Sequence, residues 1–132
     1  MKIGEAARPV EGDDLTIITY GAMVPTVLNT VKNNNLNADV LDLRTLLPMD
    51  VNAIISSAKK TGRVVIVHEA PRTLGMGAEI SALISERAIE YLYAPILRVT
   101  GPDIPFPYRL EDYYMPNEAR IMKAVKRVME FR

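Results

Sequence analysis

The chain has 132 residues and a mass of 14.7 kDa, which suits one domain and leaves no room for a second full one. Hydrophobic residues make up 48% and charged residues 24%, so the apolar surface suffices for a core and excludes disorder of the bulk of the chain. Sixteen cations balance sixteen anions, which argues against a nucleic-acid-binding face, and no apolar run approaches the roughly 20 residues of a membrane span. The absence of cysteine excludes disulfides and thiol catalysis, and fits a cytoplasmic location.

Strand and helix patterns alternate along the first half of the chain. Residues 15–20 form a β-branched run that predicts a strand, and residues 38–43 predict a second one. Between them, an i, i+3, i+4, i+7 stripe predicts an amphipathic helix, with the apolar positions Val24, Val27, Leu28 and Val31. Asp50 is a suitable N-cap for the next helix, whose end is indicated by Lys59, Lys60 and Gly62.

The second half of the chain continues the alternation. Residues 64–67 are apolar on both faces, as in a central parallel strand that helices cover on both sides. A helical stripe over residues 80–92, a strand at 96–100 and a closing helix at 118–131 follow. Four strands interleaved with four helices predict an α/β sandwich with a largely parallel sheet. We expect residues 14–132 to form this domain and residues 1–13 to be a lead-in segment.

Residues 101–117 do not fit the alternation. They show no clear period and contain four prolines and four aromatic residues, so they predict an ordered belt rich in contact area. The belt packs either on the domain itself or on a neighbouring molecule, and the pattern does not decide between the two.

The candidate site residues follow the predicted strands. His68 and Glu69 come after the apolar run 64–67, where parallel sheets bind ligands, and Gly75, Gly77 and Glu79 lie where a helix begins. One hypothesis is an anion held by this loop with His68 as acid–base group. The other, which the missing third glycine and the single histidine favour, is a tight helix start with a structural His68.

A second candidate site lies at the end of the strand 38–43. Asp42 and Arg44 could bind a substrate there, or could form an ion pair that positions a subunit contact, and we favour the second interpretation. Asp50 and Arg72 complete the set of strand-end residues that we expect at an interface. No paired carboxylates, metal-ligand spacing or nucleophile motif is present, so the chain shows no complete active site of its own.

Taken together, these segments resemble the C-terminal domain of the β subunit of thiamine-diphosphate-dependent 2-oxo acid dehydrogenases. The resemblance covers about residues 10–130. It is carried by residues 14–21, 42–50, 60–63, 68–73, 75–80, 94–101 and 103, and by Pro105-Phe106-Pro107 and Leu110-Glu111-Asp112. It implies a three-layer fold with a five-stranded, mostly parallel sheet, one antiparallel edge strand and helices on both faces.

The resemblance also implies a role. In the family, two α and two β subunits decarboxylate pyruvate or a branched-chain 2-oxo acid and transfer the acyl group to a lipoyl group. Thiamine diphosphate and Mg²⁺ bind between the α subunit and the N-terminal domain of β, so we expect this domain alone to bind neither and to be inactive. The implied partners are the α subunit, the N-terminal β domain, a second β subunit and the peripheral binding domain of the acyltransferase.

The same resemblance points to residues for acyltransferase docking. The family often carries an acidic residue just before Ala94-Pro95, whereas this chain has Tyr93, and Phe131 lies near the chain end as in related subunits. Arg132 adds a cation there, which would oppose a basic partner. Two alternatives stay open: the C-terminal domain of a transketolase or deoxyxylulose phosphate synthase, and a stand-alone anion-binding module that uses the Gly75–Glu79 loop.

Overall fold

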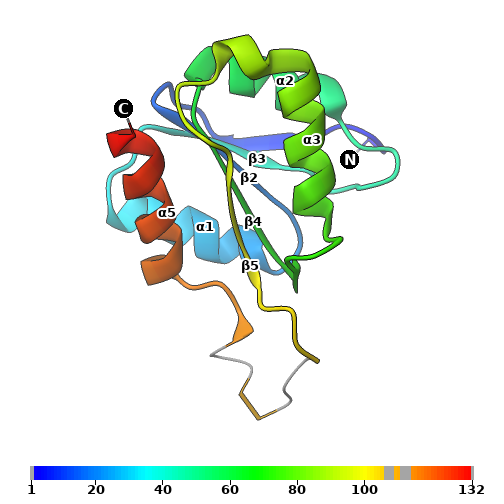
Figure 1. Cartoon of the computed structure of the whole chain (residues 1–132), viewed down its shortest axis with the longest axis vertical. Helices are drawn as coiled ribbons and strands as arrows, with labels where there is room; N and C mark the ends of the chain where they lie inside the picture. Colours follow the sequence, from blue (N-terminus) through cyan, green and yellow to red (C-terminus); the bar gives the residue numbers. More distant parts are fainter. Residues whose placement is uncertain (1, 106–108, 111–113, 132) are drawn as a thin grey trace.

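The computed structural model describes residues 2–105, 109–110 and 114–131. Five strands form one sheet in the order β1-β3-β2-β4-β5 (Figure 1). The strands are β1 (Ala7–Val10), β2 (Leu15–Thr19), β3 (Ala38–Asp42), β4 (Val64–Pro71) and β5 (Leu97–Gly101). The helices are α1 (Met23–Asn33), α2 (Val51–Thr61), α3 (Met76–Ala88) and α5 (Glu118–Glu130), with a 3-10 helix, η1 (Ile89–Tyr91), after α3.

Strands β2 to β5 are parallel, and β1 alone runs antiparallel, against β3. The registers pair Ile17 with Val40 and with Val65, so the centre of the sheet is a continuous row of β-branched side chains. The expected five-stranded mixed sheet with one antiparallel edge strand is confirmed. Its carboxyl ends, where β2, β3, β4 and β5 finish, lie at one edge of the sheet.

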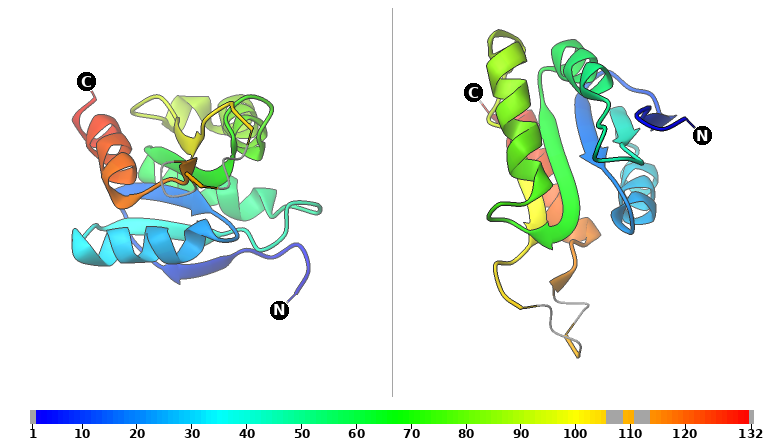
Figure 2. Two further views of the ribbon diagram at one scale, coloured as in Figure 1. Left: turned by 90° about the horizontal axis from the view of Figure 1, so that it is seen from below. Right: turned by 90° about the vertical axis from the view of Figure 1, so that its right-hand side faces the viewer.

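Helices cover both faces of the sheet, giving three layers (Figure 2). Helices α1 and α5 pack on one face, around a core that includes Val27, Val65 and Val125. Helices α2 and α3 pack on the other face, around Ile54, Ile66 and Ile84. Successive side chains of β4 therefore pack into the cores on opposite faces of the sheet. This is why residues 64–67 are all apolar and do not alternate with polar residues.

The helix-terminus predictions are confirmed for α2. The Asp50 side chain accepts a hydrogen bond from the Ala53 N–H at 3.0 Å, as an N-cap does. Gly62 ends the helix in the left-handed conformation, with φ of +73°, and its N–H donates to the Ala58 carbonyl. Asn117 caps α5 in the same way as Asp50 caps α2, through the N–H of Arg120.

Three features differ from the sequence pattern. The pattern contained four strands, and the fifth, β1, lies inside the segment 1–13 that was expected to be a lead-in; its four residues are too few and too exposed to show a period. The helix predicted over 80–92 begins at Met76 and ends at Ala88, followed by η1. The strand predicted at 64–67 continues to Pro71, with a register irregularity after Val67.

The predicted belt at 101–117 is described only in part. Tyr114 is 4% exposed, and a Cβ at Gly101 would lie 2.6 Å from its ring, so this end of the belt packs on the domain itself. Ile104 and Leu110 are exposed. Phe106, Tyr108 and Tyr113 lie outside the described residues.

Candidate functional site

His68 is a fully buried residue of β4 that joins this strand to the first turn of α3. Its Nε2 atom accepts the N–H of Gly77 at 3.1 Å, and its Nδ1 atom lies 3.2 Å from the Ala70 carbonyl oxygen. An N–H can only donate and a carbonyl can only accept, so the ring carries its single proton on Nδ1 and is neutral. Both ring nitrogens are thus occupied within the chain, and the structural interpretation of His68 is the one the geometry supports.

The surroundings of His68 favour the neutral ring. Burial lowers the pKa of His68, and the nearby Arg98 cation lowers it further, although the backbone hydrogen bond to Ala70 acts in the opposite direction. The partial positive charge at the start of α3 also opposes an imidazolium. A general acid–base role needs a proton that can be exchanged with a substrate, and this ring has neither exposure nor a free nitrogen.

The two glycines of the loop allow this close packing. A Cβ at Gly77 would lie 2.6 Å from His68 Nε2, and a Cβ at Gly75 would meet the Pro71 carbonyl oxygen. Gly75 is the N-cap residue of α3, and its carbonyl accepts the Ala78 N–H at 3.0 Å. Two N–H groups of the first turn, those of Gly77 and Ala78, are therefore already bonded, which argues against an anion cradle here.

The remaining strand-end candidates are spread along the same edge. Glu69 and Glu79 are exposed. Tyr20, which sequence analysis did not single out, lies with its ring centroid 5.9 Å from that of His68. Burial raises the pKa of Tyr20, and the charge of Glu69 adds to this. The edge is therefore a loose row of polar groups, and its described residues show no nucleophile next to a base.

Asp50 and Arg44 have structural roles in the segment 42–50. Asp50 caps α2 and also accepts the Ala6 N–H at 2.9 Å, which ties the start of β1 to this loop. Arg44 is exposed, with φ of +60°, and its backbone N–H donates to Asp42 at 3.1 Å. The expected ion pair between Asp42 and Arg44 is wrong: Asp42 binds the backbone of Arg44 because the tight turn brings the N–H to the carboxylate.

Apolar side chains project from two loops at the carboxyl ends of the strands. Leu47, after β3, is 95% exposed and Leu74, after β4, is 97% exposed. Leu74 also has φ of +60°, a conformation that costs a non-glycine residue roughly 1 kcal/mol. Hydrophobic periodicity could not find these residues because neither belongs to a helix or strand.

Tyr93 and Phe131 come together although they are distant in the sequence. Both line a groove of about 370 Å³ between α3, the segment 92–96 and the chain end, with Ser81, Ser85, Ile89, Leu92, Ala94, Pro95 and Ile96. Tyr93 is 66% and Phe131 47% exposed. The Arg63 guanidinium lies over the Tyr93 ring, 5.2 Å from its centroid. Arg132 lies outside the described residues.

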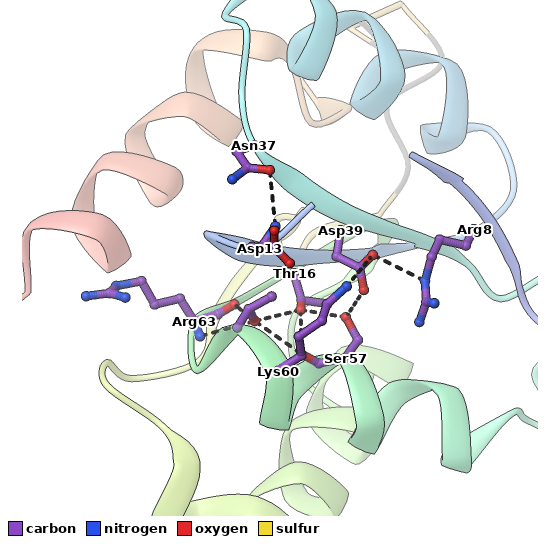
Figure 3. Close-up of polar contacts among 9 residues, drawn as sticks. Arg8, Asp13, Thr16, Asn37, Asp39, Ser57, Lys60 and Arg63 are labelled. Atoms are coloured by element: carbon purple, nitrogen blue, oxygen red, sulfur yellow. Dashed lines mark hydrogen bonds and ion pairs between the residues drawn. The ribbon is translucent and has the colours of Figure 1, made fainter. Parts of the chain in front are cut away.

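A buried polar network occupies the opposite end of the sheet and was not anticipated (Figure 3). Asp39 is fully buried, and one carboxylate oxygen lies 3.2 Å from both Arg8 Nε and Lys60 Nζ. Ser57 donates to its other oxygen and also contacts Thr16. The network links β1, β2, β3 and α2, so its role is to fix the edge strand and helix rather than to hold a ligand.

Neither a metal cluster nor a membrane span is found in the part of the chain that the structure describes. No group of three or more histidine, aspartate or glutamate side chains gathers there as ligands would. Helices α1, α2, α3 and α5 are all too short or too polar to cross a bilayer.

The fold and the arrangement of its loops define an α/β domain of the transketolase C-terminal type. Residues 4–121 match the family described as "Transketolase, C-terminal domain", and the chain belongs to this family. The C-terminal domain that sequence analysis expected is therefore confirmed at the level of the family.

Two curated relatives show the kind of protein in which such a domain occurs. The chain is 47% identical to "2-oxoisovalerate dehydrogenase subunit beta" of Pseudomonas aeruginosa, over 97% of this chain and 37% of that protein. It is 42% identical to "Pyruvate dehydrogenase E1 component subunit beta" of Bacillus subtilis, over 99% of this chain and 42% of that protein. The chain thus spans about two fifths of the length of these relatives.

Two solved structures resemble the fold. "Split gene transketolase, inactive beta4 tetramer" superposes with a TM-score of 0.85 at 26% identity, covering 99% of this chain and 43% of that one. A 2-oxoglutarate:ferredoxin oxidoreductase from Magnetococcus marinus superposes with a TM-score of 0.59 at 17% identity, covering 96% of this chain and 19% of that one. The second likeness concerns the fold alone.

Proposed function

We propose that this chain is the assembly domain of the β subunit of a 2-oxo acid dehydrogenase that acts on pyruvate or a branched-chain 2-oxo acid. The relatives named as β subunits of such enzymes match nearly the whole chain at 42–47% identity. The observation that carries the assembly role is the exposure of Leu47 and Leu74, at 95% and 97%. Two almost fully exposed leucines, on loops that follow the carboxyl ends of β3 and β4, are apolar surface that a partner can cover.

Burial of this face would supply part of the energy that a subunit contact needs, since association itself costs at least about 4 kcal/mol. Burying one leucine side chain stabilises by about 1.5–3 kcal/mol, so the pair supplies about 3–6 kcal/mol toward association. The loops that carry them begin where β3 and β4 end, and parallel strands end at the same edge of the sheet. Arg44 and Leu74 hold left-handed backbone conformations there, which suits loops shaped for a specific contact.

In this proposal the partners are the α subunit, the N-terminal β domain and a second β subunit. Thiamine diphosphate and Mg²⁺, which supply the decarboxylation chemistry when bound, would be held by the α subunit and the N-terminal β domain. The residues of this domain would act on that centre only through the subunit contacts they make. The enzyme would work in the cytoplasm.

A second role is docking of the acyltransferase's peripheral binding domain in the groove that contains Tyr93 and Phe131. The groove has apolar walls and two half-exposed aromatic rings, a composition typical of interface anchors. The Arg63 guanidinium on the Tyr93 ring places a cation at its rim. We therefore expect the partner to dock here by apolar contact. The attraction for a basic partner would be weaker than in relatives that carry an acidic residue in place of Tyr93.

The two alternatives have less support. The identity to the split gene transketolase structure is 26%, against 47% to a dehydrogenase β subunit. A stand-alone anion-binding module would need free N–H groups at the start of α3, where those of Gly77 and Ala78 are already bonded.

A chimeric β subunit tests the assembly role. This chain replaces the matching C-terminal part of the Pseudomonas aeruginosa β subunit, which is then mixed with its α subunit. Light scattering measures assembly, and oxidation of 2-oxoisovalerate and of pyruvate measures activity. We expect Leu47→Asp with Leu74→Asp to abolish assembly and turnover while the domain stays folded.

Ile89→Asp is the matched control, because Ile89 is 63% exposed but lies in the docking groove. This variant should assemble with α and should lose binding to the peripheral binding domain. Normal assembly of the double leucine variant would refute the assembly face, and unchanged docking of Ile89→Asp would refute the groove. Binding of thiamine diphosphate by the isolated 132-residue chain in calorimetry would contradict the placement of the cofactor.

A further inference from the structure

A basic groove between β5 and α5 shares no lining residue with the docking groove and contains neither Leu47 nor Leu74. It has a volume of about 330 Å³ and a floor of Leu97, Val99 and Ala124. Five cationic residues line it, Arg72, Arg98, Arg120, Lys123 and Arg127, although the Arg98 side chain itself lies against Gly77 at the start of α3. The chain as a whole is neutral, so this concentration of one sign reflects the arrangement of the charges rather than the composition.

The positive charge of the groove is not neutralised within the described part of the chain. The ion pairs found there join Lys2 to Glu5, and Arg8 and Lys60 to Asp39, and involve none of the groove's cations. Among the residues that the structure describes, no acidic side chain lines the groove.

A carboxylate does act on one of the five cations from outside the groove. Asp103 accepts hydrogen bonds from the Thr73 hydroxyl and N–H, which lower the pKa of Asp103, and the charge of Arg72 contributes to the same shift. The groove therefore remains a strongly positive surface.

Three arginines are held in position by backbone carbonyls. Arg72 and Arg98 each donate to the other's carbonyl oxygen, at 3.0 and 2.9 Å. Arg120 donates to the carbonyl of Thr100. A carbonyl does not neutralise the positive charge, but it holds the guanidinium group in position. Binding of a partner therefore costs less side-chain conformational entropy. Lys123 and Arg127 are exposed and free to adapt.

The spacing of the cations on α5 favours an extended ligand. Arg120, Lys123 and Arg127 are three and four residues apart and so share one face of the helix. At about 1.5 Å per residue they span roughly 10 Å. An extended peptide rises about 3.3 Å per residue, so a stretch of about four residues covers the same length, with alternate side chains on one side.

We propose that the β5–α5 groove docks an acidic, extended segment of a partner protein, through two or three carboxylates that meet Arg72 and the cations of α5. Arginine binds carboxylates in a bidentate manner, and β5 is an edge strand against which an extended chain can lie. A single small phosphate is a poorer match, because the N–H of Arg120 at the start of α5 is taken by Asn117 and the donors are spread along the helix.

The test uses a fluorescein-labelled peptide of eight glutamates and the complete 132-residue chain. Fluorescence anisotropy gives the dissociation constant, and circular dichroism verifies that each variant is folded. Lys123→Glu with Arg127→Glu should weaken binding at least about tenfold, since two attractive contacts become repulsive. The control is Lys126→Glu with Arg87→Glu, which makes the same charge change at exposed positions outside the groove.

A control that stays within about twofold of the unmodified chain, together with loss of affinity on raising the salt, would support the proposal. Equal weakening in both double variants would overturn it, because the effect would then come from net charge. Absence of peptide binding would also overturn it. Inorganic phosphate is added as a competitor. If it displaces the peptide when its concentration only equals the total concentration of glutamate carboxylates, the groove is a small-anion site and the proposal is overturned.

Discussion

The sole histidine of the chain makes the pH dependence of stability a direct test of the His68 geometry. The folded state keeps the ring neutral because Nε2 accepts from Gly77 and because burial lowers the pKa of His68. The unfolded chain protonates the same ring near its ordinary value of about 6.5. Between these two values the unfolded state binds more protons, so stability rises with pH and is lost on acidification.

The size of this change in the free energy of unfolding follows from the pKa of the histidine in the unfolded chain alone. If the folded ring stays neutral, acidification from pH 7.5 to pH 5.5 removes at most about 1.4 kcal/mol from the free energy of unfolding. His68→Gln keeps an oxygen that can accept the Gly77 N–H but cannot titrate. We expect the variant to lack this part of the pH dependence, while the contribution of the carboxylates cancels between the two proteins.

The assay is urea unfolding at pH 5.5, 6.5 and 7.5, analysed as the difference between the unmodified chain and His68→Gln. NMR titration of the His68 ring protons gives the folded pKa independently. Equal pH dependence in the two proteins, or a His68 pKa above 6.5, would refute the neutral, doubly bonded ring.

The remaining predictions concern two other close contacts. Gly77→Ala should lower stability by about 1–3 kcal/mol in urea unfolding, because its Cβ would lie 2.6 Å from His68 Nε2; an unchanged midpoint would mean that the ring moves freely. Asp39→Asn should destabilise by about 1–3 kcal/mol, since Arg8 and Lys60 lose the buried carboxylate they share, and both cations keep partial exposure that limits the cost. Added Arg8→Gln should then cost little further, and full additivity in this double-mutant cycle would contradict the pairing.

The local pattern of the sequence was enough to predict most of the strands and helices that form the three layers. The strands β2, β3 and β5, and the apolar part of β4, followed from short β-branched or apolar runs, and α1 from a 3.6-residue stripe. The ends of α2 were readable from Asp50 and Gly62, because caps act on N–H groups only a few residues away. These features depend on neighbours in the chain, which is why a sequence alone contains them.

Strand β1 shows where local pattern fails. It has four residues, with Arg8 and Pro9 exposed, and its partners Val40 and Asp42 lie some 30 residues further on. Only the sheet edge offered by β3 gives this segment its structure. The role of Asp39 could not be predicted for a similar reason. It lies inside an apolar run, and the cations that stabilise it come from β1 and α2.

For the candidate site, too, one part was predictable from the sequence and another part was not. The sequence indicated that His68, Gly75 and Gly77 belonged together, yet it left a catalytic and a structural role open for the ring. The contact between Nε2 and the Gly77 N–H decided for the structural role, because a nitrogen that already accepts a hydrogen bond in a buried site has no proton to exchange. Distant segments come to the same place only in the folded chain: Tyr93 and Phe131 line one groove, and β5 and α5 line the other.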